Sequence, residues 1–185
     1  MNIKSKLTIL ITLFSLVLLS CSKDDETDTI WKENNEAAFS KTANSTEYKM
    51  IQSPSKNGSI AYKVLSSTNE GGDSPLYTDE VKVRYTGWFK SVDWNKPDTY
   101  TNEEGRKIKN KYIFDTTDDR AGVPSIFKVS KVVDGFSTAL QHMKVGDKWE
   151  VWIPWRLGYG AMGQNPIPEY TTLVFEIELI EIMDS

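Results

Sequence analysis

Few side chains in this sequence are of the types that perform covalent catalysis or bind metals. His142 is the single histidine and Cys21 the single cysteine among 185 residues. A Ser–His–Asp or Cys–His arrangement therefore has little support. A zinc site would have to surround one histidine with carboxylates alone, which protein zinc sites rarely do. We expect no metal and no cofactor.

A glycine motif and the overall charge exclude two further classes of function. Gly158, Gly160 and Gly163 have the G-x-G-x-x-G spacing of dinucleotide-binding loops. They follow Pro154 and precede prolines instead of opening a helix, so the context does not fit. The formal net charge is −4 and no stripe of Lys and Arg is present, which argues against nucleic acid as a partner. Hydrophobic residues at 39% suffice for a folded core.

The N-terminus has the pattern of a secretion signal. Lys4 and Lys6 precede an uncharged run at residues 7–19. This run is shorter than the about 20 residues that cross a bilayer and suits the apolar stretch of a signal peptide. The motif Leu-Leu-Ser-Cys that ends at Cys21 resembles the lipobox of bacterial lipoproteins. We predict a signal peptide at residues 1–20 and lipidation of Cys21, because a buried free thiol fits poorly between a signal and a polar tail.

Residues 21–50 are predicted to form a polar tether. The charged cluster at residues 23–26 is compatible with the acidic tag of some outer-membrane lipoproteins, or with a solvated spacer. Thr29 is placed to cap a short helix that carries Trp31 and Phe39 on a partly helical period. Both docking of this helix on the following domain and a mobile helix remain open.

Residues 51–185 are predicted to form one domain of class α+β. Alternating apolar and polar residues predict strands near 60–64, 81–85, 149–153 and 173–180, with Gly87 ending the second of them. The spacing of Phe136, Ala139, Leu140 and Met143 predicts a helix within 134–144. Residues 90–112 are charged and lack periodicity, and they are predicted to be an insertion on the surface.

Six segments of this domain resemble, in order and spacing, the FKBP family of peptidyl-prolyl isomerases. They are Val83-Arg84-Tyr85-Thr86-Gly87, Phe114-Asp115-Thr116-Thr117, Val132-Val133-Asp134-Gly135-Phe136, Met143-Lys144-Val145-Gly146-Asp147, Tyr159-Gly160-Ala161-Met162-Gly163 and Thr172-Leu173-Val174-Phe175. The resemblance implies a half-open antiparallel sheet wrapped around one short helix, with an apolar pocket between them.

The resemblance also implies the residues of that pocket. Tyr85, Asp115 and Tyr159 are the expected catalytic residues. The expected substrate-binding residues are Phe114, Phe127, Val132, Val133, Phe136, Ile167 and Phe175. Rotation about an X–Pro bond breaks no covalent bond, so it needs no nucleophile. Taken one at a time, each aromatic residue would be explained by core packing.

The expected function is thus isomerisation of X–Pro bonds during the folding of exported proteins. The alternative is a binding or chaperone module of the same fold with weak or no isomerase activity. The expected partners are proline-containing segments of exported polypeptides, with a macrolide as a further ligand and membrane contact through the lipid alone. The expected location is the cell envelope, on the outer membrane, with its face left open.

Overall fold

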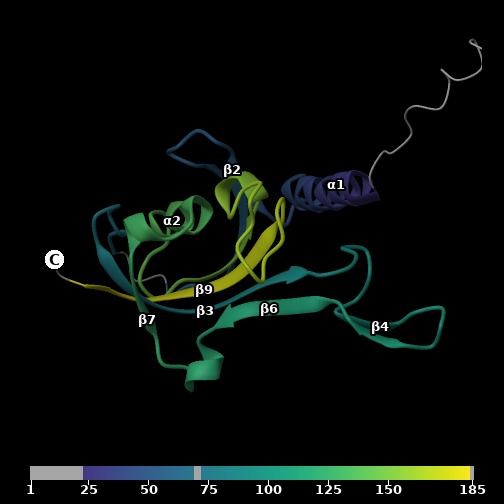
Figure 1. Ribbon diagram of the computed structural model, residues 1–185. Helices are drawn as coiled ribbons and strands as arrows, with labels where there is room; N and C mark the ends of the chain where they lie inside the picture. The colour runs from purple at the N-terminus through teal and green to yellow at the C-terminus, as the bar shows by residue number, and fades with distance from the viewer. Residues whose placement is uncertain (1–22, 69–71, 184–185) are drawn as a thin grey trace, which may run out of the picture. The chain divides into compact units, whose positions relative to one another are not determined.

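The fold is described by a computed structural model that covers residues 23–68 and 72–183 (Figure 1). The predicted signal peptide and the lipidation of Cys21 lie outside these residues. The chain divides into two compact units, Met1–Ile30 and Trp31–Ser185, and the second contains the site. Within the described segments, no helix has the length and apolar character that crossing a bilayer requires.

An antiparallel sheet forms the body of the second unit. Its strands lie in the order β1 (Lys49–Gln52), β2 (Ser59–Ser66), β8 (Lys148–Ile153), β9 (Leu173–Met183), β3 (Glu80–Lys90) and β6 (Lys111–Thr116), with β7 (Ser125–Lys128) also paired to β3. Strands β6 and β7 follow one another along the edge of β3 that β9 leaves free. Strands from distant parts of the chain thereby meet around β3.

Helix α2 (Asp134–Leu140) lies across one face of this curved sheet (Figure 1). It is nearly surrounded by protein: Phe136, Ala139 and Leu140 are buried, as is Met143 just after it. The helix ends at Leu140, earlier than the periodicity suggested, because the chain tightens when His142 N–H bonds to Ala139 O at 2.9 Å. The α+β class, with a sheet around a short helix, is confirmed.

Strand β3 differs from the prediction at Gly87. Val81, Val83 and Tyr85 are buried on the face toward α2, as their alternation predicted. The strand does not end at Gly87 but continues to Lys90. A glycine interrupts the sequence signal because it has no side chain to alternate, whereas its backbone still pairs with Phe175 in the register of β9.

The opposite face of the sheet is also partly covered. Val174 is fully buried although it alternates with the core residues of β9. It pairs with Trp88 in β3 and with Trp152 in β8. The ring of Trp94, from the insertion, lies 5.1 Å from that of Trp152. A tryptophan cluster therefore shields this face from water.

The N-terminal segment and the insertion both carry regular structure. Helix α1 spans Lys23–Ala43, and from Trp31 onward it packs on the domain, with Asn35 fully buried. The insertion contains the hairpin of β4 (Thr99–Thr101) and β5 (Lys107–Lys109). At its base, the buried side chain of Asn110 accepts hydrogen bonds from two backbone N–H groups and donates to three carbonyls. The insertion is thus anchored by a satisfied buried amide.

Candidate active site

A cavity of about 320 Å³ lies between α2 and the sheet. It is lined by Tyr85, Phe114, Asp115, Phe127, Lys131, Val132, Val133, Phe136, Tyr159, Gln164 and Phe175. We call it the aromatic cavity. Its volume is in the range of small-ligand sites, which are concave, mostly apolar and supplied with a few polar groups.

Six aromatic residues line this cavity, and five of their rings pack against one another. Phe136 lies at the centre of the set, with ring centroids 5.1 Å from Phe175, 6.0 Å from Tyr85 and 6.1 Å from Phe127. Phe114 completes the wall at 5.5 Å from Phe175. Most of these pairs meet edge to face, the arrangement that the charge distribution of aromatic rings favours. The rings therefore hold each other in place around the cavity.

Gly87 permits two of these rings to approach the strand backbone. A Cβ atom at this position would lie 2.6 Å from Phe114 Cζ and 2.6 Å from Phe175 Cε1. Both distances are well below van der Waals contact, so any side chain here would displace the rings. The missing side chain of Gly87 is thus part of the shape of the cavity.

The first turn of α2 positions Phe136 at the floor of the cavity. Val133 is the N-terminal cap residue, and Phe136 follows within the first turn. Gly135 brings this turn against β8, because a Cβ atom there would lie 2.4 Å from Ile153 Cγ2. The helix can approach the sheet only with glycine at this position. Close packing of the helix sets the depth of the cavity.

A polar group of three side chains lies at one edge. The Tyr85 hydroxyl donates a hydrogen bond to the Asp115 carboxylate. Arg120, in the short helix η2 (Asp118–Arg120), donates to the other oxygen of Asp115 at 3.1 Å and to the Tyr85 hydroxyl at 3.2 Å. Asp115 is thereby oriented by two donors, and its charge faces a guanidinium.

Burial and the negative charge of Asp115 favour the protonated forms of Tyr85 and Tyr159. Burial, together with the hydrogen bond to Asp115, raises the pKa of Tyr85 to about 12. Burial also raises the pKa of Tyr159, with a smaller contribution from the charge of Asp115. Both phenols are therefore neutral hydrogen-bond donors at physiological pH.

Two donors of the lining residues have no acceptor in the part of the chain that the structure describes. Among residues 23–68 and 72–183, neither the Tyr159 hydroxyl nor the Val133 backbone N–H makes a hydrogen bond to another group. Both residues line the cavity. Donors of cavity-lining residues that have no acceptor among the described residues are suited to bind carbonyl oxygens of an entering chain.

The structure brings together all the predicted pocket residues except Ile167. Ile167 is buried in the core and lies in the same loop as Tyr159 and Gln164, but it does not line the cavity. The sequence analysis missed Lys131, Gln164 and Arg120. Arg120 had no periodic signal; its five-residue distance from Asp115 was the only hint. No group of three or more His, Cys, Asp or Glu side chains within the described segments is arranged to hold a metal.

Comparison with known proteins connects this geometry to one family. Residues 72–180 match the family model described as FKBP-type peptidyl-prolyl cis-trans isomerase. The FKBP-type 22 kDa peptidyl-prolyl cis-trans isomerase of Escherichia coli is 37% identical over 131 residues, which are 70% of this chain and 52% of that protein. The outer membrane protein MIP of Legionella longbeachae is 34% identical over 124 residues, 66% of this chain and 44% of that protein. The chain thus spans about half the length of these curated relatives.

A solved structure shares the fold over most of the chain. It is a peptidyl-prolyl cis-trans isomerase from Pseudomonas syringae, with a TM-score of 0.62 and 26% sequence identity. The similarity covers 84% of this chain and 96% of that one.

Proposed function

The chain belongs to the FKBP-type peptidyl-prolyl cis-trans isomerase family, and on that premise we propose that it catalyses rotation about X–Pro peptide bonds. The observation that carries the proposal is the aromatic cavity. Five packed rings, a carboxylate and two donors that have no acceptor among the described residues belong to the lining of one cavity of about 320 Å³. These groups come from β3, β6, β7, α2, β9 and the loops between them.

Such a site would catalyse rotation by surrounding the X–Pro amide with apolar groups in place of water. The barrier to rotation is about 18–20 kcal/mol because the planar amide is stabilised by resonance. The planar form is also the more charge-separated one, so transfer from water into an aromatic cavity disfavours it relative to the twisted form. A rate gain of about 10⁴ requires roughly 5.4 kcal/mol, whereas one net hydrogen bond supplies about 1 kcal/mol. The apolar walls must therefore contribute most.

We assign roles on this basis. The rings around Phe136 hold the proline ring, and Ile167 supports that wall from behind. The Val133 N–H and the Tyr159 hydroxyl bind carbonyl oxygens on either side of the bond. Tyr85 and Asp115 lie against the carbonyl that rotates, with Arg120 orienting the carboxylate. The remaining wall is formed by Phe114, Phe127, Val132 and Phe175.

We further propose that the substrates are proline-containing segments of exported polypeptides. The predicted signal peptide and the predicted lipidation of Cys21 support this, and one relative is itself named an outer membrane protein. A lipid on Cys21 would attach the domain to the envelope through residues 21–50. The predicted location is the outer membrane.

The test of activity is an isomerisation assay on short X–Pro peptides with the protein produced from the full-length coding sequence. We expect the rate of cis-to-trans conversion to rise in proportion to protein concentration. Rates equal to those without protein would refute the enzymatic proposal. Binding of the same peptides in that case would support the alternative, a binding module of this fold.

A matched pair of variants tests the site assignment. Asp115→Asn removes the charge that Arg120 and Tyr85 contact, and we expect kcat/KM to fall by about 10- to 100-fold, the effect of a hydrogen bond to a charged group. Asp119→Asn makes the same chemical change at an exposed neighbour in η2, and it should leave kcat/KM unchanged. Equal rates for both variants would show that Asp115 is misassigned.

The membrane anchor has its own test. Cells that express the protein are labelled with a radioactive or clickable fatty acid, and we expect label on the wild type and none on Cys21→Ser. Absence of label on the wild type would remove the anchor while leaving the isomerase proposal intact.

A further inference from the structure

The loop between the short helix η4 (Trp155–Leu157) and β9 carries two residues of the aromatic cavity. We call residues 158–172 the site loop; it contains Tyr159 and Gln164, which both line the cavity. The loop has little regular structure, and a few bonds such as Tyr170 N–H to Gly160 O at 3.0 Å fold it on itself. Segments of this kind open at low free energy unless other elements hold them.

Helix α1 holds the end of the site loop that leads into β9. The indole N–H of Trp31 donates to Glu169 O at 2.9 Å. Asn35 Oδ1 accepts from Thr172 N–H at 2.9 Å, and Asn35 O accepts from the Thr172 hydroxyl at 3.0 Å. Asn35 and Thr172 are fully buried, so these hydrogen bonds do not compete with water.

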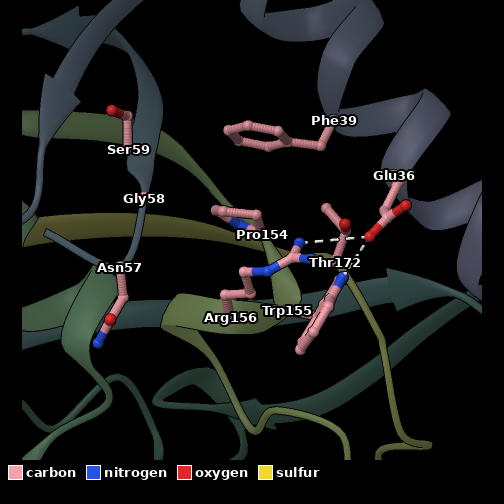
Figure 2. Close-up of a pocket in the computed structure, with 9 residues that line it drawn as sticks. All are labelled: Glu36, Phe39, Asn57, Gly58, Ser59, Pro154, Trp155, Arg156 and Thr172. Carbon is pink, nitrogen blue, oxygen red and sulfur yellow. Dashed lines mark hydrogen bonds and ion pairs between the residues drawn. The ribbon is translucent and has the colours of Figure 1, made fainter.

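The same helix also holds the segment where the site loop begins. Figure 2 shows Glu36 reaching from α1 toward Trp155 and Arg156. The Glu36 carboxylate accepts from Trp155 Nε1 at 2.9 Å and from the Arg156 guanidinium at 3.3 Å. These contacts border a second cavity, which we call the α1 groove; its volume is about 480 Å³, and it is lined by Glu36, Phe39, Asn57, Gly58, Ser59, Pro154, Trp155, Arg156 and Thr172.

Ring contacts join the two ends of the loop beneath the helix. The rings of Trp155 and Tyr170 meet edge to face with centroids 5.0 Å apart. Lys32 Nζ lies 5.3 Å from the centroid of Tyr170 and 5.9 Å from that of Trp155. The beginning and end of the site loop are thus bound to each other and to one face of α1.

From this geometry we propose that residues 31–36 of α1 position the site loop, and with it the Tyr159 hydroxyl, over the aromatic cavity. The inference rests on the proposed isomerase function and adds to it a positioning element outside the cavity. Trp31 and Asn35 bind the site loop and Glu36 binds η4 just before it, whereas Glu33 and Asn34 on the same helix are exposed. N-terminal residues that would otherwise serve only as a spacer thereby become part of the catalytic unit.

The physical reason is the sensitivity of catalysis to placement. Displacement of a catalytic group by about 1 Å can cost roughly 10²-fold in rate. The Tyr159 hydroxyl makes no hydrogen bond to another described residue, so its position depends on the loop backbone and on the packing of the ring against the core. Loss of the α1 contacts should widen the distribution of Tyr159 positions without removing any group from the cavity.

The test compares five variants with the full-length parent protein: a double variant, its two single changes Trp31→Phe and Glu36→Ala, a control and a conservative variant. The double variant Trp31→Phe/Glu36→Ala removes one donor to the loop and one acceptor for Trp155 while leaving the buried Asn35 in place. Glu33→Ala is the control, since it removes the same charge from the exposed side of the same helix. Glu36→Gln is the conservative variant, because its amide oxygen still accepts from the Trp155 indole.

Two quantities are measured: kcat/KM on X–Pro peptides, and amide hydrogen exchange by mass spectrometry over the site loop and over β3. For the double variant we expect exchange in the loop to accelerate at least about tenfold with β3 unchanged, and kcat/KM to fall about fivefold to tenfold. Glu33→Ala should match the parent, and Glu36→Gln should recover most of the loss relative to Glu36→Ala.

Three outcomes would overturn the proposal. The first is unchanged exchange in the loop, and the second is accelerated exchange with kcat/KM unchanged. The third is equal losses of activity in Glu36→Gln and Glu36→Ala. If exchange in β3 also accelerates in the double variant, the single variant Trp31→Phe, which keeps the ring and removes one donor, gives the decisive comparison. An inactive parent would instead refute the proposed function, and loop exchange would still decide whether α1 holds the loop.

Discussion

Of the aromatic cavity and the α1 groove, the smaller one has the properties of a catalytic site. The α1 groove has a volume of about 480 Å³, against about 320 Å³ for the aromatic cavity. In the groove, Glu36 is already bonded to Trp155 and Arg156. In the aromatic cavity, the Tyr159 hydroxyl and the Val133 N–H have no acceptor among the described residues. The comparison teaches that volume does not identify a site, whereas hydrogen-bond donors without an acceptor, placed among packed aromatic rings, do.

The comparison extends to electrostatics. In the groove, the hydrogen bond from Trp155 lowers the pKa of Glu36, with the charges of Lys32 and Arg156 adding to it against the opposing effect of burial. The groove thus stabilises a charged side chain. In the aromatic cavity, burial raises the pKa of both tyrosines and keeps them neutral. In the groove, a charged carboxylate of α1 binds Trp155 and Arg156, whereas neutral phenols line the aromatic cavity.

Among the changes that test this comparison of the two cavities, Gly87→Ala should have the largest effect. The added Cβ would lie 2.6 Å from atoms of Phe114 and Phe175, and such overpacking costs about 1–3 kcal/mol. We expect kcat/KM to fall at least about tenfold as the rings are displaced. Asn57→Ala, on the exposed rim of the α1 groove, should leave it unchanged. If kcat/KM of Gly87→Ala equals that of the wild type, the shape of the cavity does not limit catalysis.

A smaller loss is expected for Tyr159→Phe. This change keeps the ring and removes only the hydroxyl that faces the cavity, so kcat/KM should fall about fivefold, the effect of one net hydrogen bond. The measurement is the peptide isomerisation assay. If the variant is as fast as the wild type, the hydroxyl does not bind substrate.

Alkaline pH should destabilise the protein through Tyr85. Its pKa in the folded state is about 12, above the ordinary value of 10.0. The folded state therefore retains this proton more tightly, and the resulting stabilisation is present below pH 10 and is lost as the pH rises toward 12. In urea titrations over this range, the free energy of unfolding should fall less steeply for Tyr85→Phe than for the wild type. Tyr77→Phe, at an exposed tyrosine, is the control and should follow the wild type.

The smallest expected effect is the loss of folding stability at acidic pH that arises from Glu36 in the α1 groove. The pKa of Glu36 is lowered from the ordinary value of 4.5, so its charged form stabilises the folded state above that pH. This contribution is lost as the pH falls through the folded-state pKa. Glu36→Gln should therefore show a shallower loss of stability below about pH 4.5, and because the carboxyl is partly exposed the difference should be small. Identical acid profiles would mean that the ionisation of Glu36 does not stabilise the attachment of α1.

Much of the fold could be predicted from local patterns. The burial of Val151 and Ile153 in β8, and of Phe136 and Leu140 in α2, follows from the periods of strand and helix. The prediction that β3 ends at Gly87 was wrong. The alternation of apolar and polar residues stops at a glycine, although the strand continues and the rings of Phe114 and Phe175 occupy the space beside it. The site could be predicted only through the order of the family motifs, since each aromatic residue taken singly would be explained by core packing.

Short-range order was determined by the sequence itself: where strands and the central helix lie, that the N-terminus has the pattern of a signal, and which motifs follow one another. Only the tertiary structure decided that Arg120 reaches Tyr85 and Asp115, and that Ile167 lies in the core without lining the cavity. It also decided that Trp31 and Asn35 bind the site loop, more than 100 residues away in the chain. The physical reason is that hydrogen bonds between distant residues leave no periodic trace in the sequence. They depend on where the backbone brings a donor and an acceptor together.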